Sequence, residues 1–194
     1  MLKSLILVLA ISTLAAAGTV VGFSGAYDPS NWAFTNDAFG NSHVDWTGAP
    51  GSLTVYRNNA FTDPLLPSLT ELTITAPSAA TISFDYSFGA GDLNWSDKHD
   101  QFGAIENGAK VPLFDTYQNA SSTNPFFIST SFAVTAGETI GFYISTEKND
   151  GEGGQSFTIR NLEATSAPEP ASLAFLAAGI GMLLMRRRSL SRSH

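Results

Sequence analysis

The sequence contains no cysteine, which excludes a disulfide framework, a cysteine-ligated zinc or iron–sulfur site, and a thiol nucleophile. Charged residues are also scarce, at 14% of the chain, and long runs of the helix formers Glu, Lys, Gln and Leu are missing. Gly, Ser, Thr, Asn and Phe are frequent instead. This composition is typical of an extracellular β protein whose core is stabilised by packing alone.

Basic residues are few in the central part of the chain. Between Gly18 and Ala167 there are five Lys and Arg against sixteen Asp and Glu, which gives this part a net charge of −11. Such a surface repels phosphate backbones, so nucleic acid is not an expected partner.

Catalytic motifs are missing from this part as well. His43 and His99 lie in no HExxH motif and beside no GxSxG motif, and we interpret both as loop histidines. Gly151 to Gly154 lack the Lys and the following helix of a phosphate loop, which indicates a turn. Carboxylate pairs for glycoside hydrolysis depend on spatial separation, and the sequence singles out no pair.

The N-terminal segment 1–17 has the three-part plan of a secretory signal peptide. Lys3 precedes an apolar run from Leu5 to Leu14, and small residues follow it, with Ala15 and Ala17 at the positions that signal peptidase reads. The alternative is a buried N-terminal helix, but this run is apolar on every side and has no amphipathic period.

The C-terminal segment 167–194 contains a short apolar run. Fifteen uncharged residues from Ala171 to Met185 follow Pro168-Glu169-Pro170 and precede Arg186-Arg187-Arg188. At about 1.5 Å per residue this run reaches ~22 Å as a helix, against a hydrocarbon core of ~30 Å. It is therefore expected to be a thin transmembrane helix, and the arginines place everything before Pro168 outside the inner membrane.

A Pro-Glu-Pro triplet, a short apolar helix and an Arg cluster within the last thirty residues resemble the PEP-CTERM sorting signal. The resemblance implies export by a Gram-negative bacterium that makes exopolysaccharide. It also implies cleavage near the triplet by an exosortase, after transient anchoring in the inner membrane, and transfer to the cell surface. The two prolines would hold the segment extended, as a protease cleft requires. The alternative is a permanent tail anchor, because hydropathy alone does not separate a cleaved span from a retained one.

The remaining segment, 18–166, is predicted to be one all-β domain, an antiparallel β-sandwich or jelly roll. In Thr81–Phe88, Ile82, Phe84, Tyr86 and Phe88 alternate with Ser83, Asp85 and Ser87, as in a half-buried strand. Similar runs, separated by Gly, Pro, Asn and Asp, predict further strands at Ser52–Arg57, Leu69–Thr75, Gln101–Asn107, Phe126–Val134, Thr139–Thr146 and Phe157–Leu162. No convincing helix and no internal repeat is found here.

This domain also resembles a recurring ectodomain of PEP-CTERM proteins. The similar segments are Tyr27–Trp32, Ile82–Tyr86, Asp100–Gly103 with Asn107-Gly108, and Val134–Glu138. Where the related pattern has Leu before Asn-Gly, this chain has Glu106. The resembling group supplies no activity that could be carried over to this chain.

The densest cluster of oxygen ligands in the sequence is in the predicted loop between Gly91 and Gln101. Asp92, Asn94, Asp97 and Asp100 lie within nine residues there, and alternating oxygens are suited to calcium. The Gly and bidentate Glu of an EF-hand are missing at the required offsets. A structural calcium ion is therefore one hypothesis, and a solvated acidic loop is the other.

Tryptophan is the second candidate for ligand contact, because indole faces stack on sugar rings. Trp32 and Trp46 are flanked by strand-like residues and are expected in the core, whereas Trp95 lies in the polar loop and is a candidate carbohydrate contact.

Together these features predict an exported cell-surface or biofilm-matrix protein with a non-catalytic module for adhesion or exopolysaccharide association. The alternative is a glycan-active hydrolase or lyase. Apart from calcium, no cofactor is expected.

Overall fold

The computed structural model describes residues 18–37, 42–57, 68–90, 100–115, 123–146 and 155–166. The chain divides into two compact units, and Thr19–Ser166 forms one of them with its own hydrophobic core. Because this core is complete within Thr19–Ser166, we expect the unit to fold on its own. Residues 1–17 and 167–194 belong to the other unit and lie outside the described residues.

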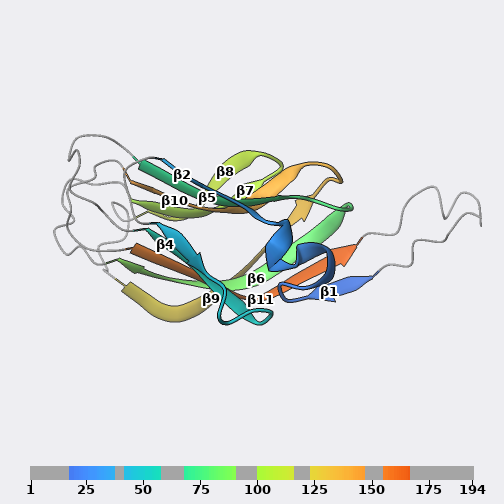
Figure 1. Cartoon of the computed structure of the whole chain (residues 1–194), viewed down its shortest axis with the longest axis horizontal. Coiled ribbons are helices and arrows are strands. Elements are labelled where there is room, and N and C mark those ends of the chain that lie inside the picture. Colours follow the sequence, from blue (N-terminus) through green and yellow to red (C-terminus); the bar gives the residue numbers. More distant parts are fainter. Residues whose placement is uncertain are drawn as a thin grey trace, which may run out of the picture. The chain divides into compact units, whose positions relative to one another are not determined.

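The domain consists of two antiparallel sheets packed face to face, as Figure 1 shows. The first sheet has the order β3-β4-β11-β6-β9, with β1 also paired to β11. Its strands are β1 (Thr19–Val21), β3 (His43–Asp45), β4 (Ser52–Arg57), β6 (Ala80–Ala90), β9 (Thr123–Val134) and β11 (Gln155–Ser166).

The second sheet has the order β2-β5-β10-β7-β8. Its strands are β2 (Ala33–Asn36), β5 (Ser68–Thr75), β7 (Gln101–Glu106), β8 (Ala109–Asp115) and β10 (Thr139–Thr146). Two single-turn 3-10 helices, η1 (Gly25–Tyr27) and η2 (Pro29–Asn31), connect β1 to β2. The described part of the domain is therefore all-β, as the sequence predicts.

The core between the sheets is built from aromatic rings supplied by both of them. Phe84 of β6 and Phe157 of β11 meet Phe142 of β10, with ring centroids 5.1 and 6.1 Å from it in edge-to-face geometry. Burial alternates strictly along β4 and most of β5, because successive side chains point to opposite faces. The period of two in the sequence thus identifies the side of each strand that joins the core.

The chain enters and leaves the domain at one end of the sandwich. Thr19 of β1 pairs with Thr165 of β11, and Ser166 pairs with Ala80 of β6. The opposite end is formed by Arg57 and Gln155 of the first sheet with Ser68 and Thr146 of the second. We call the first the tail end, since the C-terminal segment 167–194 follows Ser166.

All seven strands predicted from the sequence are present, and Ser52–Arg57 and Thr139–Thr146 have the predicted bounds. The other strands differ from the prediction at their ends, chiefly β11, which runs to Ser166. The sequence analysis did not identify β8 or the short strands β1, β2 and β3. The interpretation of His43 as a loop histidine is therefore wrong, because His43 begins β3. β8 contains Pro112, which weakens a strand pattern but is tolerated at a sheet edge.

Asn107-Gly108 forms the two-residue turn between β7 and β8. Both residues have positive φ, 50° and 81°, as the tight turn of a hairpin requires. Glu106 pairs with Ala109 just before this turn. The departure from the family-like pattern at Glu106 therefore changes the last residue of a strand and leaves the turn intact.

Candidate functional site

The tryptophans predicted for the core are packed against it. The Trp32 indole stacks on Phe142 with ring centroids 5.8 Å apart, and its Nε1–H donates to the carbonyl of Tyr27 at 3.0 Å. Trp46 meets the edge of Phe23 at 5.8 Å. Both are partly buried, so core packing is confirmed for Trp32 and Trp46. Trp95 lies outside the described residues.

Only one member of the predicted calcium cluster lies in the described part of the chain. Asp100 is 7% exposed, and one carboxylate oxygen accepts a hydrogen bond from the Gln155 amide. Asp92, Asn94 and Asp97 lie outside the described residues, so the calcium site stays a prediction. Within the described ranges, no group of three or more His, Cys, Asp and Glu is placed to hold a metal ion.

The export and sorting residues also lie outside the described ranges. They are Ala15, Ala17, Pro168, Glu169, Pro170, Arg186, Arg187 and Arg188. In the portion of the chain that the structure describes, no helix is long and apolar enough to cross a membrane. The signal peptide, the transmembrane helix and the sorting signal stay predictions.

A buried polar network closes the core at the end opposite to the tail end. The Arg57 guanidinium, 2% exposed, donates to the Gln155 side chain at 3.1 Å and to the Ser68 hydroxyl. Burial lowers the pKa of Arg57, and the charges of Asp100 and Asp37 partly offset this effect. The network links β4 and β11 of the first sheet to β5 of the second, so its role is structural.

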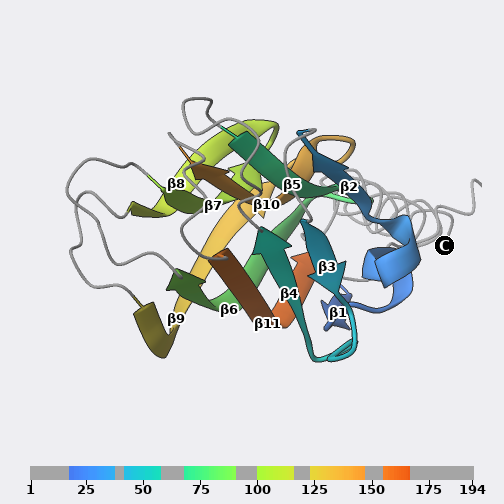
Figure 2. The same ribbon diagram turned by 60° about the vertical axis from the view of Figure 1, so that its left-hand side comes forward.

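Polar side chains from four adjacent strands gather on the outer face of the second sheet. The register of β5, β10, β7 and β8 places them on the side that faces away from the core. We call this surface the Tyr143 face and define it by Glu71, Gln101, Lys110, Asp115 and Tyr143. In Figure 2 these strands form the upper sheet, with β8 at its margin.

Two glycines leave the centre of the Tyr143 face without side chains that would project from the sheet. Gly103 of β7 pairs with Tyr143 of β10, and the phenol ring lies over it, where any side chain on residue 103 would overlap the ring. A side chain on Gly141 of β10 would likewise overlap the Leu72 carbonyl of β5. The ring of Tyr143 therefore lies flat on the sheet and is only 1% exposed.

An ion pair spans the centre of the Tyr143 face. The Lys110 ammonium of β8 lies 2.8 Å from the Glu71 carboxylate of β5, although β7 and β10 separate the two strands. The side chains of Lys110 and Glu71 are 44% and 25% exposed, so solvent screens the pair and it adds little stability. Both groups remain accessible to a ligand that offers hydrogen bonds.

A chain of hydrogen bonds orients the rest of the face. The Tyr143 hydroxyl donates to Oε1 of Gln101 at 3.5 Å, and Nε2 of Gln101 donates to Asp115 at 3.1 Å. Burial and the charge of Asp115 raise the pKa of Tyr143 to about 12. The phenol is therefore protonated at neutral pH, and the face presents donors and acceptors in fixed positions.

The sequence analysis did not identify this face. Its members are spread from residue 71 to residue 143, and each is an ordinary polar residue of a strand pattern. The one usable signal was the alternation of Lys110 and Pro112 with Val111 after the Asn107-Gly108 turn, which places β8 beside β7. Which strands then lie next to β7 is a matter of topology.

No family model and no curated protein matches the chain. Solved structures with a similar strand arrangement include a variant of a family 29 carbohydrate-binding module, 12% identical, with a TM-score of 0.40 over 78% of this chain and 94% of that chain. A second variant of that module, in complex with mannohexaose, is 13% identical with a TM-score of 0.40 over 78% of this chain and 93% of that chain.

The cleaved adhesin domain of Lys-gingipain from Porphyromonas gingivalis is also similar, at 13% identity with a TM-score of 0.40, over 77% of this chain and 100% of that chain. At these values the likeness is one of general strand arrangement. The likeness assigns no residue of this chain a role, and the β-sandwich fold rests on the two sheets themselves.

Proposed function

We propose that this protein is an exported surface module that binds neutral polysaccharide through the Tyr143 face, without catalysing a reaction on it. The observation that carries the proposal is the row of hydrogen-bonding groups across the sheet, Glu71, Lys110, Gln101 and Asp115, with buried Tyr143 beneath them holding Gln101 in place. A sugar chain offers hydroxyl groups along its length, which can donate to the carboxylates and accept from the ammonium and the amide.

The ligand class follows from charge. The domain carries a net charge of −11 over residues 18–167, and the face itself has two carboxylates against one ammonium. A polymer rich in uronic acids would be repelled by this surface. Neutral polysaccharides carry no such charge and are not repelled, so they are the proposed ligands.

The same domain fits an exported protein held at the surface. Segment 1–17 is proposed to be removed by signal peptidase, and an exosortase is proposed to act near Pro168 after transient anchoring in the inner membrane. Thr19 and Thr165 pair on neighbouring strands, so both processing sites join the domain at the tail end. The Tyr143 face extends along the side of the sandwich, where cleavage at the tail end leaves it unchanged.

A screen on polysaccharides tests the proposal. The folded domain, residues 18–166, would be incubated with the producer's own exopolysaccharide, with neutral glucans and mannans, and with a uronic acid polymer. We expect retention on neutral polymers, little change with added salt, and no release of oligosaccharides. Released oligosaccharides would establish the alternative of a glycan hydrolase or lyase. Retention on none of the polymers would contradict the binding function.

Matched variants locate the binding surface. Glu71→Gln and Gln101→Ala remove hydrogen-bonding groups from the Tyr143 face and should each weaken binding about 5- to 150-fold, since a lost hydrogen bond to a charged or polar group is worth about 1–3 kcal/mol. Glu163→Gln makes the same charge change at an exposed residue of β11, in the other sheet, and should leave binding unchanged. Equal effects of Glu71→Gln and Glu163→Gln would place the site elsewhere.

A further inference from the structure

The free edges of the two sheets are protected differently. In the first sheet β3 is three residues long and contains His43 and Asp45, whereas β9 at the other edge is 12 residues long. In the second sheet β2 has four residues, and β8 contains Lys110, Pro112 and Asp115. Short length, charge and proline all discourage an edge strand from pairing with another chain. Among the described edges, β9 is the long one without charge.

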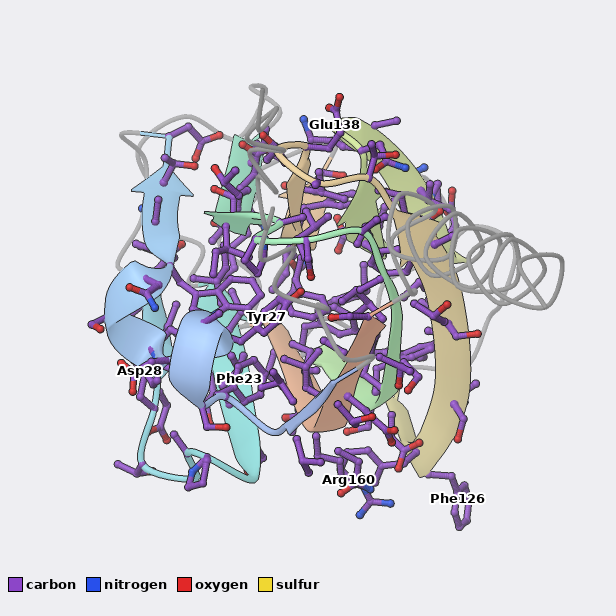
Figure 3. The ribbon with its side chains drawn as sticks, turned by 90° about the vertical axis from the view of Figure 1, so that its right-hand side faces the viewer. Phe23, Tyr27, Asp28, Phe126, Glu138 and Arg160 are labelled. Atoms are coloured by element: carbon purple, nitrogen blue, oxygen red, sulfur yellow. The ribbon has the colours of Figure 1, made fainter. Side chains whose placement is uncertain are left out.

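The charge-free region extends beyond β9 itself. No Asp, Glu, Lys or Arg occurs between Asp115 and Glu138, in a domain with a net charge of −11. Two large apolar side chains on β9 also face solvent, Phe126 at 78% and Ile128 at 40% exposure. Figure 3 shows Phe126 projecting away from the sandwich at the end of β9. An edge of this kind favours association over solubility.

The backbone N–H and C=O groups of β9 that point away from β6 define how much of this edge can pair with another strand. The Asn107 side chain of the β7–β8 turn donates to the Ala133 carbonyl at 3.3 Å, so this carbonyl points away from β6. Because backbone groups of an edge strand point outward at every second residue, those of Ser131 and Ser129 do so as well. Asn107 closes the edge at Ala133, and Pro125 has no N–H to donate. The open edge therefore runs from Phe126 to Phe132, and its Phe126 end contains an irregularity, because the register with β6 shifts between Ile128 and Asn124.

We propose that a second copy of this chain pairs with this edge, β9 against β9, in antiparallel orientation about a two-fold axis. Two copies that each carry a charge of −11 repel one another except where their surfaces are uncharged, and the open edge itself contains no charged residue. The charged groups beside it, Arg160 over the Phe127 ring and Asp85 at Ser129, form an ion pair with each other and so add no net charge. The segment from Phe126 to Phe132 is centred on Ser129. Pairing it with itself places Ser129 opposite Ser129 of the second copy and covers Ile128 in both.

The orientation has a consequence for assembly. β9 runs parallel to β11, because both are antiparallel to β6, so Val134 lies at the tail end with Ser166. Antiparallel pairing of two copies points their tail ends in opposite directions. The dimer then connects two surfaces, or two regions of a matrix, and does not pair neighbours that stand side by side on one membrane. This inference is independent of polysaccharide binding.

The first experiment uses single cysteines, which are unambiguous because the natural chain has none. Ser129→Cys in the 18–166 domain should form a disulfide-linked dimer on mild oxidation, since the two thiols face each other across the axis. Thr81→Cys, exposed on the neighbouring strand β6, is the matched control and should stay monomeric. Equal crosslinking of both variants, or of neither, would overturn the proposal.

The second experiment measures mass in solution. The unmodified domain should sediment as a dimer, and added salt should not dissociate it because the interface contains no ion pair. Phe126→Lys with Ile128→Lys should weaken self-association about tenfold or more. Val21→Lys with Phe34→Lys adds the same charge at side chains that are 67% and 39% exposed on β1 and β2, and should leave the dimer intact.

These outcomes separate the alternatives. A monomer at every concentration, or a dimer that the Val21→Lys and Phe34→Lys control dissociates, contradicts pairing at β9. Assemblies larger than a dimer also contradict it, because one pairing uses the open edge of both copies. If circular dichroism shows that the Phe126→Lys and Ile128→Lys variant is poorly folded, the crosslinking comparison of Ser129→Cys with Thr81→Cys still tests pairing at β9.

Discussion

The phenol ring of Tyr143 lies over Gly103, on the outer face of the second sheet, and is buried there although it faces away from the core. A glycine in the middle of a strand is unfavourable in itself, so its presence marks a close approach. Here the approaching group is the ring that supports the Tyr143 face.

Gly103→Ala should therefore disturb this face. A methyl group at residue 103 would overlap the Tyr143 ring and the Val111 carbonyl, and we expect a loss of about 1–3 kcal/mol in the free energy of unfolding. Polysaccharide binding should weaken with it. Gly51→Ala is the control, because the nearest atom to a new methyl group there is 3.5 Å away. Denaturant titration of the two variants checks the difference. A Gly103→Ala variant as stable as Gly51→Ala would show that the ring moves without cost.

The buried Arg57 network should be sensitive to the loss of either charge. Arg57→Met leaves Asp100 buried without its cation, which should cost about 3–5 kcal/mol of unfolding free energy. Adding Asp100→Asn to Arg57→Met should recover part of this loss. A double-mutant cycle by urea unfolding measures the coupling. Additive losses would mean that Arg57 and Asp100 stabilise the fold independently.

Asp85 makes the first sheet sensitive to acid. Its carboxylate accepts hydrogen bonds from Ser129 at 2.6 Å and Asn161 at 2.7 Å, and these bonds, with the Arg160 charge 3.5 Å away, lower the pKa of Asp85. A lowered pKa in the folded state contributes stability above the unfolded pKa of about 3.9, and this contribution is lost as pH falls through the folded value.

Wild type and Asp85→Asn should thus differ in melting temperature at pH 5–7 and converge as pH falls below about 3.9. Ser83→Ala, on the same strand and outer face, is the control. Its melting temperature should differ from that of wild type by an amount that does not depend on pH. If the difference in melting temperature between wild type and Asp85→Asn stayed constant over the whole pH range, Asp85 would not be the acid-sensitive group.

Calcium binding remains a prediction from the sequence, and the structure changes the variants that test it. Asp100 bonds Gln155 in the core, so its substitution would destabilise the domain with or without a metal. Asp92→Asn with Asp97→Asn avoids this problem.

A bound calcium ion at hundredfold excess over its Kd would raise the free energy of unfolding by about 2.7 kcal/mol. We expect a higher melting temperature in calcium than in chelator for the natural chain, and no difference for the double variant. A natural chain that melts alike in both would leave the loop as a hydrated acidic surface.

Most strands could be predicted because their signal is local. Ile82, Phe84, Tyr86 and Phe88 alternate with polar residues since one face of β6 is buried, and the structure buries these four. The core positions of Trp32 and Trp46 followed from their strand-like neighbours. The pattern failed for β8, where Pro112 interrupts it, and for β1, β2 and β3, which are too short to show a period.

The sequence by itself determined the all-β class, the absence of cysteine chemistry, the acidic surface and the Asn107-Gly108 turn, because each depends on composition or on residues close together in the chain. Only the tertiary structure decided that Glu71 meets Lys110 across two strands, that Asp100 bonds Gln155 in the core, and that β9 is an uncharged edge. Those relationships depend on the order of strands in each sheet. Strand order is set by packing between segments far apart in the chain, and a local pattern does not encode it.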